Sequence, residues 1–418
     1  MFSKALKRLP QSFVWSFTGL LGRFVLQTFS FILIASELGP SGFGTFSAAL
    51  ALTLVLAPFV EMGAYAITVR DSKTPHLLAT SLGTTLKTTS VLLPVAILVL
   101  TAASYLALKE LNLILTILLG LGVFVGMRFM YVAQAVNASL SKFSRNAVFD
   151  MGLSLALLIG AFSVKLIGSG KVDAWFLMYA SIYGVVGFLF FLFTTRAERI
   201  RIGAGGSWNA IVERLREGWT FAFGGMAQSA YSELDKTILL NLAGAPAVGR
   251  YSMAVRLIQV SYMPINALLN VTFPKMFRLM DSNEVGALSR YLLKIILTAL
   301  VYSVLCVLTL QVLAPLLPNL FGEEYASSTH LLKLIALAVV LQGVYWPILD
   351  ALTAMGFQKL RMIITFGGVA ANVTLNLILI PSMKEYGAVV SYLASQLILL
   401  VVASVLIVWS TKRMVGKG

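Results

Sequence analysis

Polar side chains follow one helix face through a stretch of the chain that is otherwise apolar. Within residues 13–35 they recur at spacings of three and four: Ser16, Gly19, Arg23, Gln27 and Ser30. This spacing places them on one face of a helix. An arginine inside an apolar span costs at least about 2.5 kcal/mol to insert, which makes Arg23 a candidate functional residue. We expect it to face a wet cavity; the alternative is a structural pair with a carboxylate on another helix.

A second stripe of this kind lies in residues 247–272. Its members share one helix face: Ser252, Arg256, Gln259, Met263, Asn266 and Asn270. The predicted substrate-binding residues are Arg23, Gln27, Arg128, Lys236, Arg256 and Gln259. For Arg128 the alternative is a side chain that extends to the cytoplasmic interface. For Lys236 the alternative is an ion pair with Glu233, three residues earlier on the same helix.

Acidic residues also occur inside the apolar stretches. They are Glu61, Glu233, Asp235 and Asp350. A carboxyl group in a low-dielectric environment tends to hold a proton, so it can serve as a proton carrier. We predict that Glu61, Asp235 and Asp350 act in coupling or gating, and the alternative is that they pair with the arginines. No coupling-ion signature occurs in the sequence, and both proton and sodium coupling stay open.

The residue types on these stripes favour an anionic, hydroxyl-rich ligand. Arginine offers a fixed fork of donors that matches phosphate oxygens and stays protonated. Amide and hydroxyl side chains suit sugar hydroxyls. A cavity for lipophilic cations would instead carry more acids than bases. The stripes therefore indicate a basic central cavity for an anionic ligand that carries hydroxyl groups.

Several kinds of chemistry find no support in the sequence. The chain has two histidines and one cysteine, Cys306, which do not make a metal site. It has no phosphate-binding P-loop, and no loop is long enough to form a catalytic domain. We expect a non-enzyme without cofactor or metal. A membrane glycosyltransferase or polymerase is the less favoured interpretation.

The elements that must position these side chains are membrane-spanning helices. The chain of 418 residues is 58% hydrophobic and 12% charged, which excludes a disordered protein and is typical of a polytopic membrane protein. We predict an all-α fold with about twelve spans: 13–35, 44–69, 79–106, 111–136, 146–168, 174–194, 218–242, 247–272, 291–316, 328–354, 360–381 and 386–410. The first span follows three cations, Lys4, Lys7 and Arg8, and we expect it to be retained rather than cleaved as a signal peptide.

The net charge of +15 is explained mainly by membrane topology. With the N-terminus in the cytoplasm, 21 lysines and arginines fall in inside segments and five in outside segments. This asymmetry follows the positive-inside rule and predicts that both termini are cytoplasmic, in the cell (inner) membrane. The cations lie between apolar runs rather than on one wet face, so we expect no nucleic-acid partner.

The chain also repeats a short pattern. Gly39, Gly44, Phe46 and Ser47 match Gly244, Gly249, Tyr251 and Ser252, each at an offset of 205 residues. Both sets follow the first helix of a group of six spans. We therefore predict an N-terminal lobe at 1–200, a cytoplasmic linker at 201–217 and a C-terminal lobe at 218–418. Six is an even number, so the two repeats are expected to be parallel and to move by alternating access.

Three segments resemble one family. Leu38–Ser47 resembles the signature after the first helix of polysaccharide (O-antigen type) flippases, which share a superfamily with multidrug and toxin extruders. Asp235–Leu239 followed by Val248–Ser252 resembles the start of that family's second half. Phe321–Tyr325 resembles the outside loop before its tenth helix. The resemblance spans nearly the whole chain.

The resemblance implies a two-lobe fold like that of the multidrug extruders (MATE). It also implies a substrate, an oligosaccharide on polyprenyl pyrophosphate that moves from the cytoplasmic to the outer leaflet. Membrane lipid and glycan polymerase machinery are the other implied partners. The alternative function is a multidrug or ion-coupled antiporter of the same fold.

Overall fold

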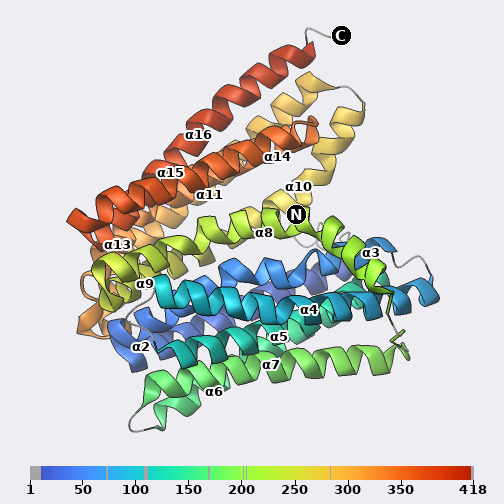
Figure 1. Cartoon of the computed structure of the whole chain (residues 1–418). Helices are drawn as coiled ribbons and strands as arrows, with labels where there is room; N and C mark the ends of the chain where they lie inside the picture. Colours follow the sequence, from blue (N-terminus) through green and yellow to red (C-terminus); the bar gives the residue numbers. More distant parts are fainter. Residues whose placement is uncertain are drawn as a thin grey trace. The chain divides into compact units, whose positions relative to one another are not determined.

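The computed structural model describes residues 11–71, 74–107, 112–167, 170–200, 202–203, 205–282 and 284–415. These residues form α-helices joined by short turns, without a β-strand among them (Figure 1). The helices of the first part of the chain are α2 (Gln11–Glu61), α3 (Ala64–Asp71), α4 (Pro75–Ala107), α5 (Leu113–Ser139), α6 (Phe143–Lys165) and α7 (Lys171–Ala197). The predicted all-α fold is confirmed.

The second part of the chain continues in the same way. Its longer helices are α8 (Trp208–Ala243), α9 (Ala245–Ser261), α10 (Met263–Asp281), α11 (Val285–Leu313), α14 (Leu337–Ala354), α15 (Gln358–Met383) and α16 (Glu385–Val415). Short helices lie between α11 and α14: η1 (Ala314–Leu316), α12 (Leu317–Phe321), η2 (Glu323–Tyr325) and α13 (Ser328–Ile335).

Among the described residues, nine helices are long and apolar enough to cross a membrane. One of them, Gly22–Asp71, covers the second predicted span and the first one from residue 22 onward. Two predicted spans, 218–242 and 247–272, lie in helices that are not among the nine. Both contain polar stripes, which lower their mean hydropathy. Lys4, Lys7 and Arg8, which contribute to the predicted orientation, lie outside the described residues.

The helices form two compact units. Unit 1 comprises residues 1–38 and 48–229, and unit 2 comprises residues 39–47 and 230–418. The division runs through α2 and through α8, so neither helix belongs to one unit alone. The predicted lobe boundaries at 200 and 217 stay a prediction.

An apolar core holds the helices of each unit together. In unit 1, Leu82, Val132 and Phe190 are fully buried in a cluster formed by α4, α5 and α7. In unit 2, Leu352 and Leu399 are buried between α14, α15 and α16. These cores fix the helix faces from which the polar side chains project.

The two copies of the glycine motif have the same backbone conformation. Gly39 interrupts α2 with φ 63° and ψ 176°, and Gly244 precedes α9 with φ 81° and ψ 169°. A positive φ is accessible to glycine without steric cost. Because the two positions are equivalent in the repeat, this shared conformation supports the predicted duplication.

The two motifs also contact each other within unit 2. A Cβ added at Gly44 would lie 1.8 Å from the carbonyl oxygen of Ala245, and one added at Gly249 would lie 2.0 Å from that of Pro40. Only glycine permits backbones to approach this closely. Gly44 is equivalent to Gly249 in the repeat, and Pro40 is equivalent to Ala245, so the contact is reciprocal. We call it the glycine crossing.

Candidate functional site

Arg23 of α2 forms an ion pair with Asp150 of α6 in unit 1. The guanidinium Nη1 lies 3.7 Å from Oδ2 of Asp150, and Gln134 of α5 donates a hydrogen bond of 3.2 Å to Oδ1 of the same carboxylate. The side chain of Arg23 is 39% exposed and that of Asp150 is 23% exposed. The carboxylate partner considered for Arg23 is therefore present, and the cation stays accessible. Asp150 is not among the predicted acids, although it lies four residues into the predicted span 146–168.

Glu61 and Tyr131 belong to the same cluster. Tyr131 of α5 interacts electrostatically with Arg23, Asp150 and Glu61, the last residue of α2. The predicted substrate-binding Arg23 and the predicted coupling acid Glu61 are thus brought together in unit 1. We call Arg23, Glu61, Tyr131, Gln134 and Asp150 the Arg23 cluster. Gln27 lies one turn beyond Arg23 on α2, and its binding role stays a prediction.

Arg128 of α5 is bound to α4. Its Nη2 donates hydrogen bonds of 2.8 Å to the carbonyl oxygen of Leu86 and 2.7 Å to Oγ of Ser90. A helix carbonyl oxygen has two lone pairs, so that of Leu86 can accept from the guanidinium as well as from the helix backbone. The contacts join two helices of unit 1, and a substrate role for Arg128 stays a prediction.

Lys236 and Asp235 of α8 are buried in unit 2 with separate partners. Lys236 Nζ lies 2.6 Å from Glu233 and donates to the carbonyl oxygen of Ser232 at 3.2 Å. Asp235 accepts hydrogen bonds from the backbone N–H of Lys236, at 2.7 Å, and from the hydroxyl of Tyr251 in α9. The alternative considered for Lys236, an ion pair with Glu233, is present, and a substrate role for Lys236 stays a prediction. In the sequence, Tyr251 stands out only as part of the repeat.

Arg256 and Gln259 lie one turn apart on α9. Arg256 Nη1 donates to Oε1 of Gln259 at 3.4 Å, and the charge of Arg256 acts on Lys236. Two predicted binding residues, Arg256 and Gln259, are therefore in contact, and a third, Lys236, lies within electrostatic range of Arg256. Their role toward a substrate stays a prediction.

Asp350 of α14 is paired with Arg361 of α15. Arg361 Nη1 donates hydrogen bonds of 2.9 Å to Oδ1 of Asp350 and 2.9 Å to Oγ1 of Thr353. The alternative considered for Asp350, a structural pair, matches this contact. Arg361 lies in a segment predicted to be cytoplasmic, and the sequence does not identify it as the partner of Asp350.

A further polar network in unit 1 binds residues 202–203 and 205–217 to the ends of α3 and α4, and we call these residues the linker strap. Gly203 N–H donates to the carbonyl oxygen of Ala79 at 3.1 Å, and Gly206 N–H donates to Oγ1 of Thr84 at 2.9 Å. Gly83 permits this approach, because a Cβ there would lie 2.3 Å from the carbonyl oxygen of Gly203. The strap is thus hydrogen-bonded through its backbone along one face of α4.

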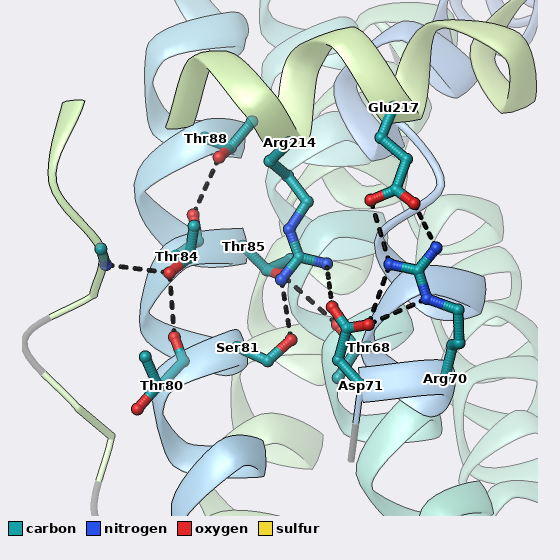
Figure 2. A network of polar contacts seen from close by, with 11 residues as sticks. Thr68, Arg70, Asp71, Thr80, Ser81, Thr84, Thr85, Thr88, Arg214 and Glu217 are labelled. Carbon is teal, nitrogen blue, oxygen red and sulfur yellow. Dashed lines mark hydrogen bonds and ion pairs between the residues drawn. The ribbon is translucent and has the colours of Figure 1, made fainter. Parts of the chain in front are cut away.

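Charged side chains fasten the C-terminal part of the strap (Figure 2). Arg214 is nine-tenths buried, donates to Oγ of Ser81 at 2.8 Å and lies 3.5 Å from Asp71. Arg70 binds both carboxylate oxygens of Glu217 and also pairs with Asp71. The Arg70 guanidinium holds the pKa of Glu217 below its usual value. Residues 208–217, the C-terminal part of the strap, are the first turns of α8.

No group of three or more potential metal-ligating side chains occurs within the described part of the chain. The polar sites are instead ion pairs and amide or hydroxyl contacts between apolar helices. Bundles of this kind, with ionisable residues inside the spans, are typical of membrane transporters.

Comparison with known proteins agrees with that class. An inward-facing multidrug resistance MATE family transporter of the MOP superfamily is similar over 94% of this chain and 95% of its own, with a TM-score of 0.78 and 17% identity. The lipid II flippase MurJ in an inward closed conformation matches 96% of this chain and 89% of its own, with a TM-score of 0.78 and 13% identity. An outward-facing MATE transporter matches with a TM-score of 0.60 and 16% identity, over 97% of this chain and 96% of its own.

The sequence itself identifies the family. A family model described as polysaccharide biosynthesis protein matches residues 9–280, and the chain belongs to that family. The search of curated protein sequences found no match. The chain is therefore a multi-pass membrane protein with the fold shared by MATE transporters and MurJ, and the predicted two-lobe fold is confirmed.

Proposed function

We propose that the protein is a flippase. It moves a polyprenyl-pyrophosphate-linked oligosaccharide from the cytoplasmic to the outer leaflet of the inner membrane by alternating access through a basic central cavity. The observation that carries this proposal is Arg23, an accessible guanidinium inside an apolar span, in a chain of the polysaccharide biosynthesis family. Both termini lie in the cytoplasm in this proposal, as the distribution of cations predicts.

The proposed roles of the site residues follow from their chemistry. Arg23 and Arg256 bind the pyrophosphate or an acidic sugar, because a guanidinium offers several parallel donors to phosphate oxygens. Gln27 and Gln259 bind sugar hydroxyls, and Arg128 and Lys236 are further binding residues of lower priority. The acids Glu61, Asp235 and Asp350 are candidates for coupling to protons or sodium ions. Glycan polymerase machinery is the proposed downstream partner.

Complementation tests this proposal. A cell that lacks its own polysaccharide flippase is supplied with the wild-type protein, with Arg23→Ala or with Arg256→Ala, and surface glycan is quantified at equal protein level. Losing a charge-assisted hydrogen bond costs about 1.5–3 kcal/mol, so each variant should lower export roughly 10- to 100-fold. Arg278→Ala, which removes an exposed arginine, is the matched control. Normal export by both Arg23→Ala and Arg256→Ala would contradict the proposed binding role.

A second candidate function is a multidrug or ion-coupled antiporter. The similarity to MATE transporters favours it. The same strains distinguish the two, because an antiporter would confer resistance to cationic drugs without restoring glycan export. An enzyme of glycan assembly is the least favoured alternative. It is tested in a strain that lacks its own flippase and carries an inactive polymerase. Glycan export restored by the protein in that strain would argue against an assembly enzyme.

A further inference from the structure

The ion pair between Arg23 and Asp150 is looser than others in the chain. Its closest nitrogen–oxygen distance is 3.7 Å, whereas Arg361 lies 2.9 Å from Asp350 and Lys236 lies 2.6 Å from its acid. Charge-assisted N–H···O hydrogen bonds are normally 2.7–2.9 Å long. Arg23 and Asp150 therefore attract each other electrostatically without a hydrogen bond, which leaves the donors of the guanidinium available to another acceptor.

The two partners are held differently. Asp150 is fixed by the hydrogen bond from Gln134, which occupies Oδ1 and leaves Oδ2 toward the guanidinium. Arg23 is the more exposed of the two and carries a long, flexible side chain. An exchange of partners would therefore be made by movement of Arg23, while Asp150 stays in place.

The Arg23 cluster supplies a counter-ion for Arg23 when no substrate is bound. It contains two acids, Glu61 and Asp150, and one base, Arg23, all acting on Tyr131. An arginine left without a counter-ion inside an apolar span is costly, so an acid at this position stabilises the empty state. A diphosphate carries more negative charge than one carboxylate and accepts two parallel hydrogen bonds from a guanidinium. It can thus displace Asp150 from Arg23.

We infer that Asp150 is a positioning residue that competes with the diphosphate of the substrate for Arg23. In the protein without substrate, Asp150 neutralises the charge of Arg23 and orients its side chain. When the lipid-linked diphosphate binds, Arg23 exchanges the carboxylate for phosphate oxygens. When the substrate leaves, Asp150 takes Arg23 back and so promotes release. This inference rests on the proposed flippase function, and it assigns the diphosphate as the part of the substrate that Arg23 binds.

The competition predicts effects of opposite sign on binding and transport. Asp150→Asn keeps the size of the side chain and the oxygen that accepts from Gln134, but removes the competing charge. Partly exposed ion pairs contribute about 1 kcal/mol, so the variant should bind undecaprenyl diphosphate roughly fivefold more tightly than the wild type. Its rate of flipping in proteoliposomes should fall, because release is slower. A merely structural role would lower both affinity and rate.

The experiment measures Kd for undecaprenyl diphosphate by microscale thermophoresis of the full chain in detergent, beside a flipping assay in liposomes. The variants are Asp150→Asn, Arg23→Ala, the double variant, and Glu198→Gln as a control acid outside the cluster. Arg23→Ala should weaken binding, and the double variant should bind as weakly as Arg23→Ala, because the gain requires the guanidinium. Melting curves check that each variant is folded.

The outcomes separate this inference from the proposed function. If Arg23→Ala weakens binding but Asp150→Asn leaves it equal or weaker, partner exchange is wrong and the diphosphate role of Arg23 stands. If Arg23→Ala binds undecaprenyl diphosphate as well as the wild type, both ideas are wrong. Tighter binding by the double variant than by Arg23→Ala would also overturn the exchange, since it would show that Asp150 acts on the ligand without Arg23.

Discussion

Replacing Arg214 with methionine should weaken the attachment of the linker strap to the end of α4. The guanidinium hydrogen bond to Ser81 is charge-assisted, nine-tenths buried and worth about 1.5–3 kcal/mol. The pair with Asp71, at 3.5 Å and partly exposed, adds at most about 1 kcal/mol. Methionine keeps the apolar stem in place, so the loss is mainly polar. We therefore expect a cost of about 2 kcal/mol, which raises the population of the open strap roughly 30-fold.

Hydrogen exchange of the backbone amides of Gly203 and Gly206 measures this opening. Gly203 N–H and Gly206 N–H are hydrogen-bonded to α4 in the closed strap, so their exchange reports on its release. Exchange there should be roughly 30-fold faster in Arg214→Met, whereas Arg216→Met, an exposed arginine two residues further on, should exchange like the wild type. Equal exchange in all three proteins would refute the idea that Arg214 fastens the strap.

Two further predictions concern stability. Gly44→Ala places a Cβ 1.8 Å from a carbonyl oxygen of α9, and overpacking of this kind costs about 1–3 kcal/mol. The melting temperature in detergent should therefore fall by several degrees, whereas that of Gly286→Ala, where nothing lies within 4 Å, should not. Equal melting of the two variants would contradict the glycine crossing. Glu198→Gln tests an ion-pair cluster in which Lys142 and Arg145 hold the pKa of the acid below its usual 4.5. A lowered pKa stabilises the fold above about pH 4.5, so the melting difference from wild type should be present at pH 7 and disappear as the pH falls below that value; a constant difference would argue against the charge effect.

The features predicted correctly from the sequence depend on local patterns. Apolar length and hydropathy predict helices, and a repeated glycine at a fixed offset predicts the same turn, as Gly39 and Gly244 confirm. A spacing of three along one helix predicts that Glu233 and Lys236 meet, and they do. Each of these inferences requires only the geometry of a single helix or turn.

The partners on different helices could not be predicted in this way. Asp150 meets Arg23 across two helices, and Tyr251 meets Asp235 across a turn, which no spacing in the sequence encodes. Counting every acid inside the predicted spans would have drawn attention to Asp150, although not to its partner. The position of Arg361 in the sequence indicates only a cation of the cytoplasmic side. Its pair with Asp350 forms only when α14 and α15 pack together.

The reciprocity of the glycine crossing has an evolutionary consequence. A contact in which residue i of one copy meets residue j of the other, and j meets i, is the signature of a two-fold symmetric homodimer. Gly44 against Ala245 and Gly249 against Pro40 are such a pair. The crossing is what remains of a subunit interface if an ancestral protein of half this length assembled as a dimer before its gene was duplicated and fused. Since fusion, each copy has been free to diverge, which explains why Arg23 on α2 and Arg256 on α9 occupy positions that the repeat does not relate.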